Sequence, residues 1–172
     1  VLKGAEVKSA GTVSINAGQD IKLQTVSTGE DLEVTWSKNG TRQGASSQSL
    51  GTTVSAQGDA TLKAGHDIQA QAASLSAGHT LTLDAKGAIA LEAAIDSEAA
   101  HTYHKSKSGM NYYRLDANSQ AQEINRSTLS GEHVVIKSGG DTTLAAVTVN
   151  AGRLDIDAKG KLILPTVTTH DS

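Results

Sequence analysis

Short aliphatic pairs, each with its two members separated by one residue, recur along almost the whole chain. They are Val13/Ile15, Ile21/Leu23, Leu81/Leu83, Ile89/Leu91, Val134/Ile136, Val147/Val149, Leu154/Ile156 and Leu162/Leu164. A period of two predicts short β-strands with one buried face. Glycines lie between the pairs, and glycine suits the corners between such strands. The pattern therefore predicts an all-β chain of short strands and tight corners.

The spacing of the glycines predicts how these strands are arranged. Matching glycines recur with a period of about 20 residues, a length typical of one turn of a solenoid. Examples are Gly58/Gly78, Gly65/Gly87, Gly131/Gly152 and Gly140/Gly160. Coils of that length, stacked about 4.8 Å apart, place their aliphatic side chains in inward columns. Parallel strands joined by same-sense crossovers are nearly always right-handed. We therefore predict a right-handed parallel β-helix, a solenoid whose thin coils leave no room for phenylalanine.

The sequence also contains a second repeat, which is longer than one coil. It is seen in the matching segments AGQDIKLQTVST (17–28), AKGAIALEAAIDS (85–97) and AKGKLILPTVTT (158–169), in which Ala17, Ala85 and Ala158 correspond. After the first two, the glycine–aliphatic rhythm stops, which predicts irregular or β-hairpin insertions over residues 29–55 and 98–129. A third insertion is expected after His170. On this interpretation residues 1–172 are a single β-helix fragment of a longer filament.

The two insertions resemble each other and carry turn signals. Thr35-Trp36 matches Thr102-Tyr103, and ASSQS (45–49) matches ANSQA (117–121). Asn39-Gly40 lies between alternating residues, which predicts a type I′ hairpin. Ser108-Gly109 is a weaker signal of the same kind.

All the aromatic side chains lie in the insertions, together with several basic ones. The candidate partner-binding residues are Trp36, Lys38, Arg42, Tyr103, Lys105, Lys107, Tyr112, Tyr113 and Arg114. In one interpretation the insertions fold back and cover the helix side with Trp36, Tyr103 and Tyr113. In the other they form an exposed surface that recognises a receptor or glycan, since aromatic and arginine side chains dominate binding hot spots.

Composition excludes several classes of function. The formal net charge is −3, so no overall positive field favours nucleic acid, and we expect no nucleic-acid partner. The chain has no cysteine, which excludes disulfides and thiolate chemistry. No apolar run reaches the roughly 20 residues that a membrane-spanning helix needs.

Catalytic and metal sites find little support in the spacing of ionisable residues. A β-helix enzyme acting on polysaccharides needs converging carboxylates. Asp20, Asp67 and Asp141 instead follow corner glycines, where we expect them to cap backbone N–H groups. His101 and His104 are separated by an odd number of positions and so fall on opposite faces of a strand. We therefore predict no catalytic residue, no metal and no cofactor.

The repeated AGxDIxL units, the KSKSG insertion segment and the restart TLSGEHVVIKSGGD give the chain a specific resemblance. It resembles the haemagglutinin repeats of filamentous haemagglutinin and related two-partner-secreted exoproteins, including contact-dependent growth inhibition effectors. The resemblance implies a giant right-handed β-helix, exported through an outer-membrane barrel transporter to the surface of a Gram-negative bacterium.

In that family such a segment would be a non-enzymatic shaft, contacting neighbouring repeats of the same chain and serving adhesion, virulence or toxin delivery. Two alternatives stay open. The insertions could make the segment a receptor- or glycan-binding module, or the solenoid could be a polysaccharide-active enzyme.

Overall fold

The computed structural model describes residues 1–37 and 39–169, and the described residues form strands, turns and connections without a helix. Lys38 and the third insertion expected after His170 lie outside them. The strands are β1 (Leu2–Lys3), β2 (Glu6–Ser9), β3 (Val13–Ala17), β4 (Ile21–Gln24), β5 (Val26–Ser37), β6 (Gly40–Leu50), β7 (Thr53–Ala56), β8 (Ala60–Ala64), β9 (Ile68–Gln71), β10 (Ser74–Ala77), β11 (Thr80–Ala85), β12 (Ile89–Glu92), β13 (Ala94–Ser108), β14 (Asn111–Asn125), β15 (Ser127–Ser138), β16 (Thr142–Leu144), β17 (Val147–Ala158) and β18 (Leu162–Ile163).

The chain divides into two compact units. The first, which we call the solenoid, comprises Val1–Val26, Ser49–Ala94 and Ile124–Val167. The second, which we call the hairpin sheet, contains Ser27–Gln48 and Ile95–Glu123. Residues 49–55 and 124–129 were predicted to belong to the insertions, because the glycine–aliphatic rhythm is interrupted there. They belong to the solenoid, because β7 and the start of β15 both pair with β10.

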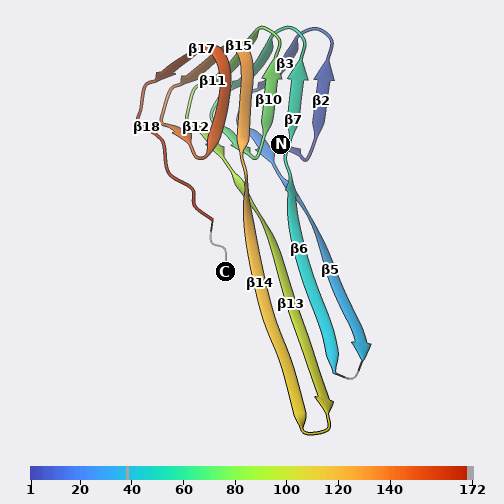
Figure 1. Cartoon of the computed structure of the whole chain (residues 1–172). Helices are drawn as coiled ribbons and strands as arrows, with labels where there is room; N and C mark the ends of the chain where they lie inside the picture. Colours follow the sequence, from blue (N-terminus) through green and yellow to red (C-terminus); the bar gives the residue numbers. More distant parts are fainter. Residues whose placement is uncertain (38, 170–172) are drawn as a thin grey trace. The chain divides into compact units, whose positions relative to one another are not determined.

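The solenoid is built from parallel strands in two sheets (Figure 1). One has the order β1-β4-β9-β12-β16-β18. The other has the order β2-β7-β10-β15-β11-β8-β3, with β17 added beside β15. Each coil contributes one strand to the first sheet and then two successive stretches to the second; in β15 and β17 these two stretches are continuous. This is the predicted solenoid of stacked parallel coils.

Strand register explains the longer sequence repeat. Ala17 pairs with Ala64 across a coil that carries a hairpin, and Ala64 pairs with Ala85 across a coil that carries none. The same alternation follows, since Ala85 pairs with Ser138 across the second hairpin and Ser138 pairs with Ala158 across a plain coil. Two coils and one hairpin thus make up the longer repeat, which is why Ala17, Ala85 and Ala158 correspond in the sequence.

The aliphatic pairs form inward columns. Ile15, Leu62, Leu83, Ile136 and Ile156 stack in register from coil to coil. The three central members are fully buried, which stabilises each by about 2 to 3 kcal/mol relative to exposure. The predicted inward pairs are more exposed in the last strands, where Leu154 and Leu162 are 43% and 47% exposed. These strands, β17 and β18, have a paired neighbour on one side only in the described structure.

The corner that follows each strand of the six-stranded sheet alternates between two forms. Gly4, Ala72 and Ala146 turn this corner in the left-handed backbone region, with φ of +48°, +45° and +51°. After β4 and β12 the chain instead leaves as a hairpin and returns. The hairpins therefore replace a tight turn at the same corner of every second coil, a regularity that the sequence repeat implied without locating.

A buried hydroxyl marks each return from a hairpin. Ser127 Oγ donates to the carbonyl of Glu92, at the end of β12, over 2.6 Å and accepts the N–H of Ala73. Thr52 Oγ1 lies 3.4 Å from the carbonyls of Leu2 and Gln24, the latter at the end of β4. Because buried backbone carbonyls need hydrogen-bond donors, these hydroxyls satisfy the groups that the interrupted coil leaves open.

The hairpin sheet has the strand order β14-β13-β6-β5, with β6 and β13 antiparallel (Figure 1). Both predicted hairpins are present, but their turns differ from the prediction. Gly40 begins β6 and does not have the positive φ that a type I′ turn on Asn39-Gly40 requires. The second turn lies between Ser108 and Asn111, with Gly109 at φ +61°, one residue later than Ser108-Gly109.

Candidate functional site

The hairpin sheet places the aromatic residues on two opposite faces, because side chains alternate along a strand. The β6–β13 register pairs Gln43 with His101 and Ala45 with Ala99 on one face, which we call the groove face. It pairs Gly40 with His104 and Arg42 with Thr102 on the other, which we call the indole face.

On the indole face, Trp36, His104 and Tyr113 form a row of rings that spans β5, β13 and β14. The centroid of the His104 ring lies 6.3 Å from that of Trp36 and 6.2 Å from that of Tyr113. The indole also covers Gly40, where a Cβ atom would collide with it. A side chain at residue 40 would therefore have to displace the indole of Trp36.

On the groove face, two tyrosines lie beside cations. The guanidinium of Arg114 is 5.7 Å from the ring centroid of Tyr103, and the ammonium of Lys105 is 5.6 Å from that of Tyr112. Both distances lie within the range of cation–π attraction. Lys107 shares this face by alternation from Tyr103 and Lys105.

Asp116 joins the cationic and imidazole groups of the groove face. Its carboxylate is 3.0 Å from His101 Nε2 and accepts a hydrogen bond of 2.9 Å from Arg114 Nη2. These contacts hold the pKa of Asp116 below its ordinary value, and the hydrogen bond with His101 has the largest effect. In turn Asp116 raises the pKa of Arg114. Arg114 thus contacts both Asp116 and the ring of Tyr103.

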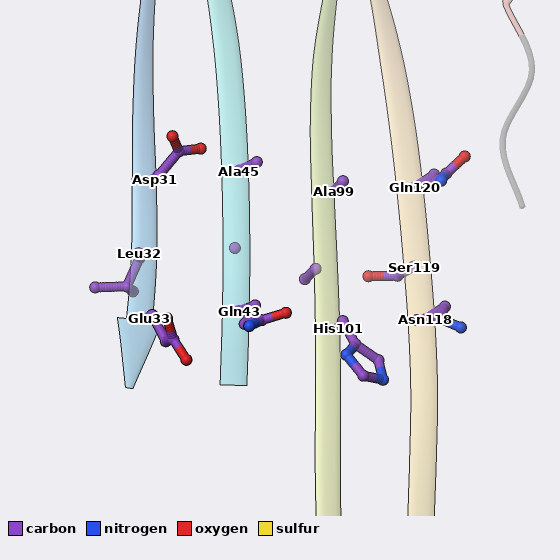
Figure 2. A pocket seen from close by; sticks show the side chains of 12 residues that line it. Asp31, Leu32, Glu33, Gln43, Ala45, Ala99, His101, Asn118, Ser119 and Gln120 are labelled. Carbon is purple, nitrogen blue, oxygen red and sulfur yellow. The ribbon is translucent and has the colours of Figure 1, made fainter. Parts of the chain in front are cut away.

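Next to these residues the groove face is hollowed into an open groove of about 810 Å³ (Figure 2). Its lining residues are Asp31, Leu32, Glu33, Gln43, Gly44, Ala45, Ala99, Ala100, His101, Asn118, Ser119 and Gln120. Asp31, Gln43, His101 and Gln120 point to one side of the sheet in Figure 2, whereas Leu32 and Ser119 point to the other. Small residues on the two central strands, such as Ala45 and Ala99, form its floor.

The polar groups of the groove are amides, carboxylates and one imidazole, all of which can form hydrogen bonds. Its carboxylates, Asp31 and Glu33, lie on the single strand β5, and the far side carries the amides Asn118 and Gln120. Paired acid and base carboxylates facing each other across a glycosidic bond are therefore lacking among the described lining residues. The described residues also contain no group of three or more histidine, cysteine or acidic side chains placed to hold a metal ion.

The structure separates the predicted binding residues into two sets. Trp36, Arg42 and Tyr113 belong to the indole face, whereas Tyr103, Lys105, Lys107, Tyr112 and Arg114 belong to the groove face. Lys38 lies outside the described residues. The amide and acidic residues of the groove were missed in the sequence. On β5 their signal is the alternation of Asp31 and Glu33 with Leu32 and Val34, whereas the uniformly polar stretch 118–120 on β14 carries no such signal.

The sequence alignment of the two insertions is displaced. Strand β13 begins at Ala94 and β5 at Val26, so Trp36 corresponds to His104 and not to Tyr103. Likewise β14 ends at Asn125 and β6 at Leu50, so Ala45 corresponds to Gln120, whereas the ASSQS–ANSQA match aligned it with Ala117. Both slips are by an odd number of positions, and such a slip moves a strand's side chains to the opposite face. This is why the sequence analysis grouped the aromatic residues of both insertions on a single candidate surface.

In the solenoid, the corner aspartates cap backbone N–H groups as predicted, and they do so in the neighbouring coil. Asp20 Oδ1 accepts the N–H of Asp67 at 3.3 Å, and Asp67 Oδ1 that of Ala88 at 2.8 Å. Asp141 Oδ1 accepts the N–H of Lys161 at 2.8 Å. The hydrogen bond from the Asp67 backbone holds the pKa of Asp20 below its ordinary value. These carboxylates therefore join coils and do not converge on a groove.

A helix long and apolar enough to span a membrane is not found in the part of the chain that the structure describes.

Parallel coils with aliphatic columns, interrupted at one corner by hairpins that form their own sheet, define a repeat solenoid. A family model described as Hemagglutinin repeat matches residues 33–125 and 110–171. The chain therefore belongs to the Hemagglutinin repeat family, which is typical of filamentous haemagglutinin-like exoproteins. No curated protein and no solved structure matches the chain.

Proposed function

We propose that this chain is a non-enzymatic shaft segment of a secreted, cell-surface filament that serves adhesion or contact-dependent toxin delivery. The observation that carries the proposal is the register of the coils. Aliphatic side chains stack on one another from coil to coil in inward columns, as in the column Leu62, Leu83 and Ile136. Since each coil contacts only its neighbours, such a column propagates without limit and gives a stiff rod.

Export through an outer-membrane barrel transporter to the surface of a Gram-negative bacterium is part of this proposal. Two features support it. The absence of cysteine leaves no disulfide to block passage of an unfolded chain, and coils that contact only their neighbours fold one after another as they emerge. The family membership supports the same route.

A second candidate function is recognition of a receptor or glycan by the hairpin sheet. The observation that favours it is the 810 Å³ groove with its amides and carboxylates, together with Tyr103 and Tyr112 on the same face of the sheet. Sugar hydroxyls bind to planar amide and carboxylate groups, and tyrosine rings stack on sugar faces.

One experiment separates the two candidates. The labelled chain and a variant in which residues 101–114 are replaced by a short Asn-Gly turn are incubated with bacterial cells and with animal cells. For a shaft, neither protein binds while both melt as folded β-structure. Binding by the wild type that the replacement abolishes would overturn the shaft assignment and favour recognition.

Point variants then locate the recognising face. The double variant Gln43→Ala, Asn118→Ala alters the groove face, and Arg42→Ala alters the indole face as the matched control. The probes are purified lipopolysaccharide and a panel of immobilised animal glycans. Glycan recognition by the groove requires that the first variant loses binding and that the second retains it.

A further inference from the structure

The corner that follows β18 resembles the corners from which the two hairpins leave. Strand register gives Thr166 the position that Ala72 and Ala146 occupy after β9 and β16. Those two alanines turn a plain coil with a positive φ, whereas Thr166 has no positive φ. In this it matches Thr25 and Ala93, which precede the hairpins. A β-branched residue is also rare in the left-handed region, so threonine at this corner disfavours a plain coil.

The boundaries of the two compact units give the same result. The chain leaves the solenoid after Val26, Ala94 and Val167, which occupy matching positions in the longer repeat. Thr168 and Thr169 are grouped with the hairpin sheet, as are the residues that follow Val26 and Ala94. The segment that begins after Val167 therefore corresponds to the first strand of a hairpin.

Strand spacing shows where a third hairpin would lie in the hairpin sheet. In the solenoid, β4 and β12 are separated by the single strand β9, and β12 and β18 by the single strand β16. In the hairpin sheet, β5 and β13, which follow β4 and β12, are separated by the single strand β6. Successive hairpins are thus two strand spacings apart in either unit, roughly 9 to 10 Å. The same period places the first strand of a third hairpin directly beside β14.

The β14 edge is suited to receive such a strand. In the described structure β14 has a paired neighbour on one side only, which is β13. Proteins usually protect free edges with charges or proline, but β14 carries neither from Ala117 to Ala121. Leu115, nearer the turn, is 39% exposed. This stretch is therefore open to pairing with a further strand.

The contact between the two existing hairpins gives the register. Strand β6 pairs antiparallel with β13, and Arg42 lies opposite Thr102. Strand β14 corresponds to β6, because both are second strands of their hairpins and end at matching residues, Asn125 and Leu50. Ala117 takes the position of Arg42 in this alignment. It would therefore face the residue of the third hairpin that corresponds to Thr102.

We propose that the β14 edge binds the chain's own continuation, namely the first strand of a third hairpin that leaves the solenoid after Val167. The proposal rests on the shaft function, in which coils continue beyond this segment. Because one hairpin leaves at every second coil, the pairing repeats along the filament and joins the hairpins into one continuous antiparallel sheet. Backbone hydrogen bonds of this sheet then hold successive repeats together, in addition to the stacked coils.

An extended chain supplies the third hairpin for a test. Residues 1–169 are joined to a copy of residues 97–172, since Thr169 and Asp96 occupy matching positions in the longer repeat. The native chain has no cysteine, so an introduced pair of cysteines reports the register without interference.

The test pair combines Ala117→Cys in the original hairpin with Thr102→Cys in the added copy. Asn118→Cys with the same Thr102→Cys is the matched control, because residues 117 and 118 face opposite sides of the sheet. We expect the test pair to form its disulfide about tenfold faster, since a disulfide requires Cβ atoms about 4 Å apart. The rate should not depend on protein concentration, because both cysteines belong to one molecule.

A second extension shows whether the added coils fold without a third hairpin. Residues 1–166, with Thr166→Gly, are joined directly to a copy of residues 127–172, which makes the interrupted coil a plain one. Circular dichroism and thermal melting report the folding of both extensions. We expect both to fold.

The remaining outcomes would overturn the proposal in distinguishable ways. Equal disulfide rates of the two cysteine pairs would show that the register is wrong. Disulfides formed mainly between molecules would identify a second copy as the occupant of the edge. An extended chain that fails to fold while the plain extension folds would show that β14 does not accept the hairpin, and it would leave the shaft function standing. If neither extension folds, the coils do not propagate, and the shaft function fails together with this proposal.

Discussion

The carboxylate of Asp67 occupies the space that a side chain at Gly87, in the next coil, would need. The same carboxylate accepts the N–H of Ala88, so it holds the two coils together while it excludes any larger residue beneath it. Asp141 and Gly160 repeat the arrangement. Aspartate in one coil and glycine in the next are thus one interlocking unit, and the glycines have a role beyond turning corners.

Replacing Gly87 by alanine should destabilise the solenoid. The new methyl group must displace the Asp67 carboxylate, and overpacking of this kind costs about 1 to 3 kcal/mol. Gly18→Ala is the matched control, because a Cβ at Gly18 meets nothing within 4 Å. Chemical denaturation gives both values. Equal effects of the two substitutions would contradict the interlock.

A double-mutant cycle tests the pairing directly. Removing the carboxylate in Asp67→Ala also removes the obstacle to a side chain at residue 87. The combined loss in the double variant should therefore be smaller than the sum of the two single losses. An additive result would show that Gly87 is needed for a different reason.

Glycine at position 146 should raise stability, the reverse of its usual effect in a strand protein. Ala146 has φ +51°, and the left-handed region costs an alanine roughly 1 to 2 kcal/mol. After the larger unfolded-state entropy of glycine is subtracted, a gain of up to about 1 kcal/mol remains. Ala151→Gly, within the extended strand β17, is the control and should lose about 0.5 to 1 kcal/mol. The order of the two denaturation midpoints decides the matter.

The sequence predicts the solenoid well because its cause is local and repeated. Three signals recur in coil after coil: the period of two, the coil length marked by glycines, and the columns of Leu and Ile. Because they recur, a single exception in one coil does not hide them. The strand that carries Leu83 and the capping role of Asp67 follow from such repetition.

The candidate site is less predictable because it depends on register between distant strands. Residues 36 and 104 meet only when β5, β6 and β13 pair in a particular alignment, and a one-residue slip exchanges the faces. Trp36 and Tyr103 therefore appeared to be equivalent in the sequence, although they lie on opposite sides of the sheet. The groove has no motif at all, since its amides come from β6 and β14, two strands of different hairpins that are far apart in the sequence.

A charge in an aliphatic column should unfold the neighbouring coils. Leu83 is fully buried and lies between Leu62 and Ile136, so Leu83→Asp should lower the free energy of unfolding by several kcal/mol. Ile136→Asp should have the same effect. Thr82→Asp, one residue earlier and on the outer face, should change it little. Melting temperatures unchanged by the two column substitutions would show that the inward assignment is wrong.

Acid should remove a defined contribution to stability at the contact between β15 and β17. The carboxylate of Asp155 is 2.7 Å from His133 Nε2 and 2.9 Å from Arg153 Nε. Both contacts hold the pKa of Asp155 below its ordinary value, and the hydrogen bond with His133 has the largest effect. A carboxyl group whose pKa is lower in the folded than in the unfolded chain stabilises the fold above its unfolded pKa of about 3.9. That contribution is lost as the pH falls through the lower, folded pKa. The wild type should therefore exceed Asp155→Asn in denaturation midpoint at pH 6, and the difference should shrink progressively below pH 4. Other carboxylates titrate in both proteins, so their effects cancel in the difference. A gap that stays constant from pH 6 to pH 2.5 would mean that Asp155 acts through its shape and not through its charge.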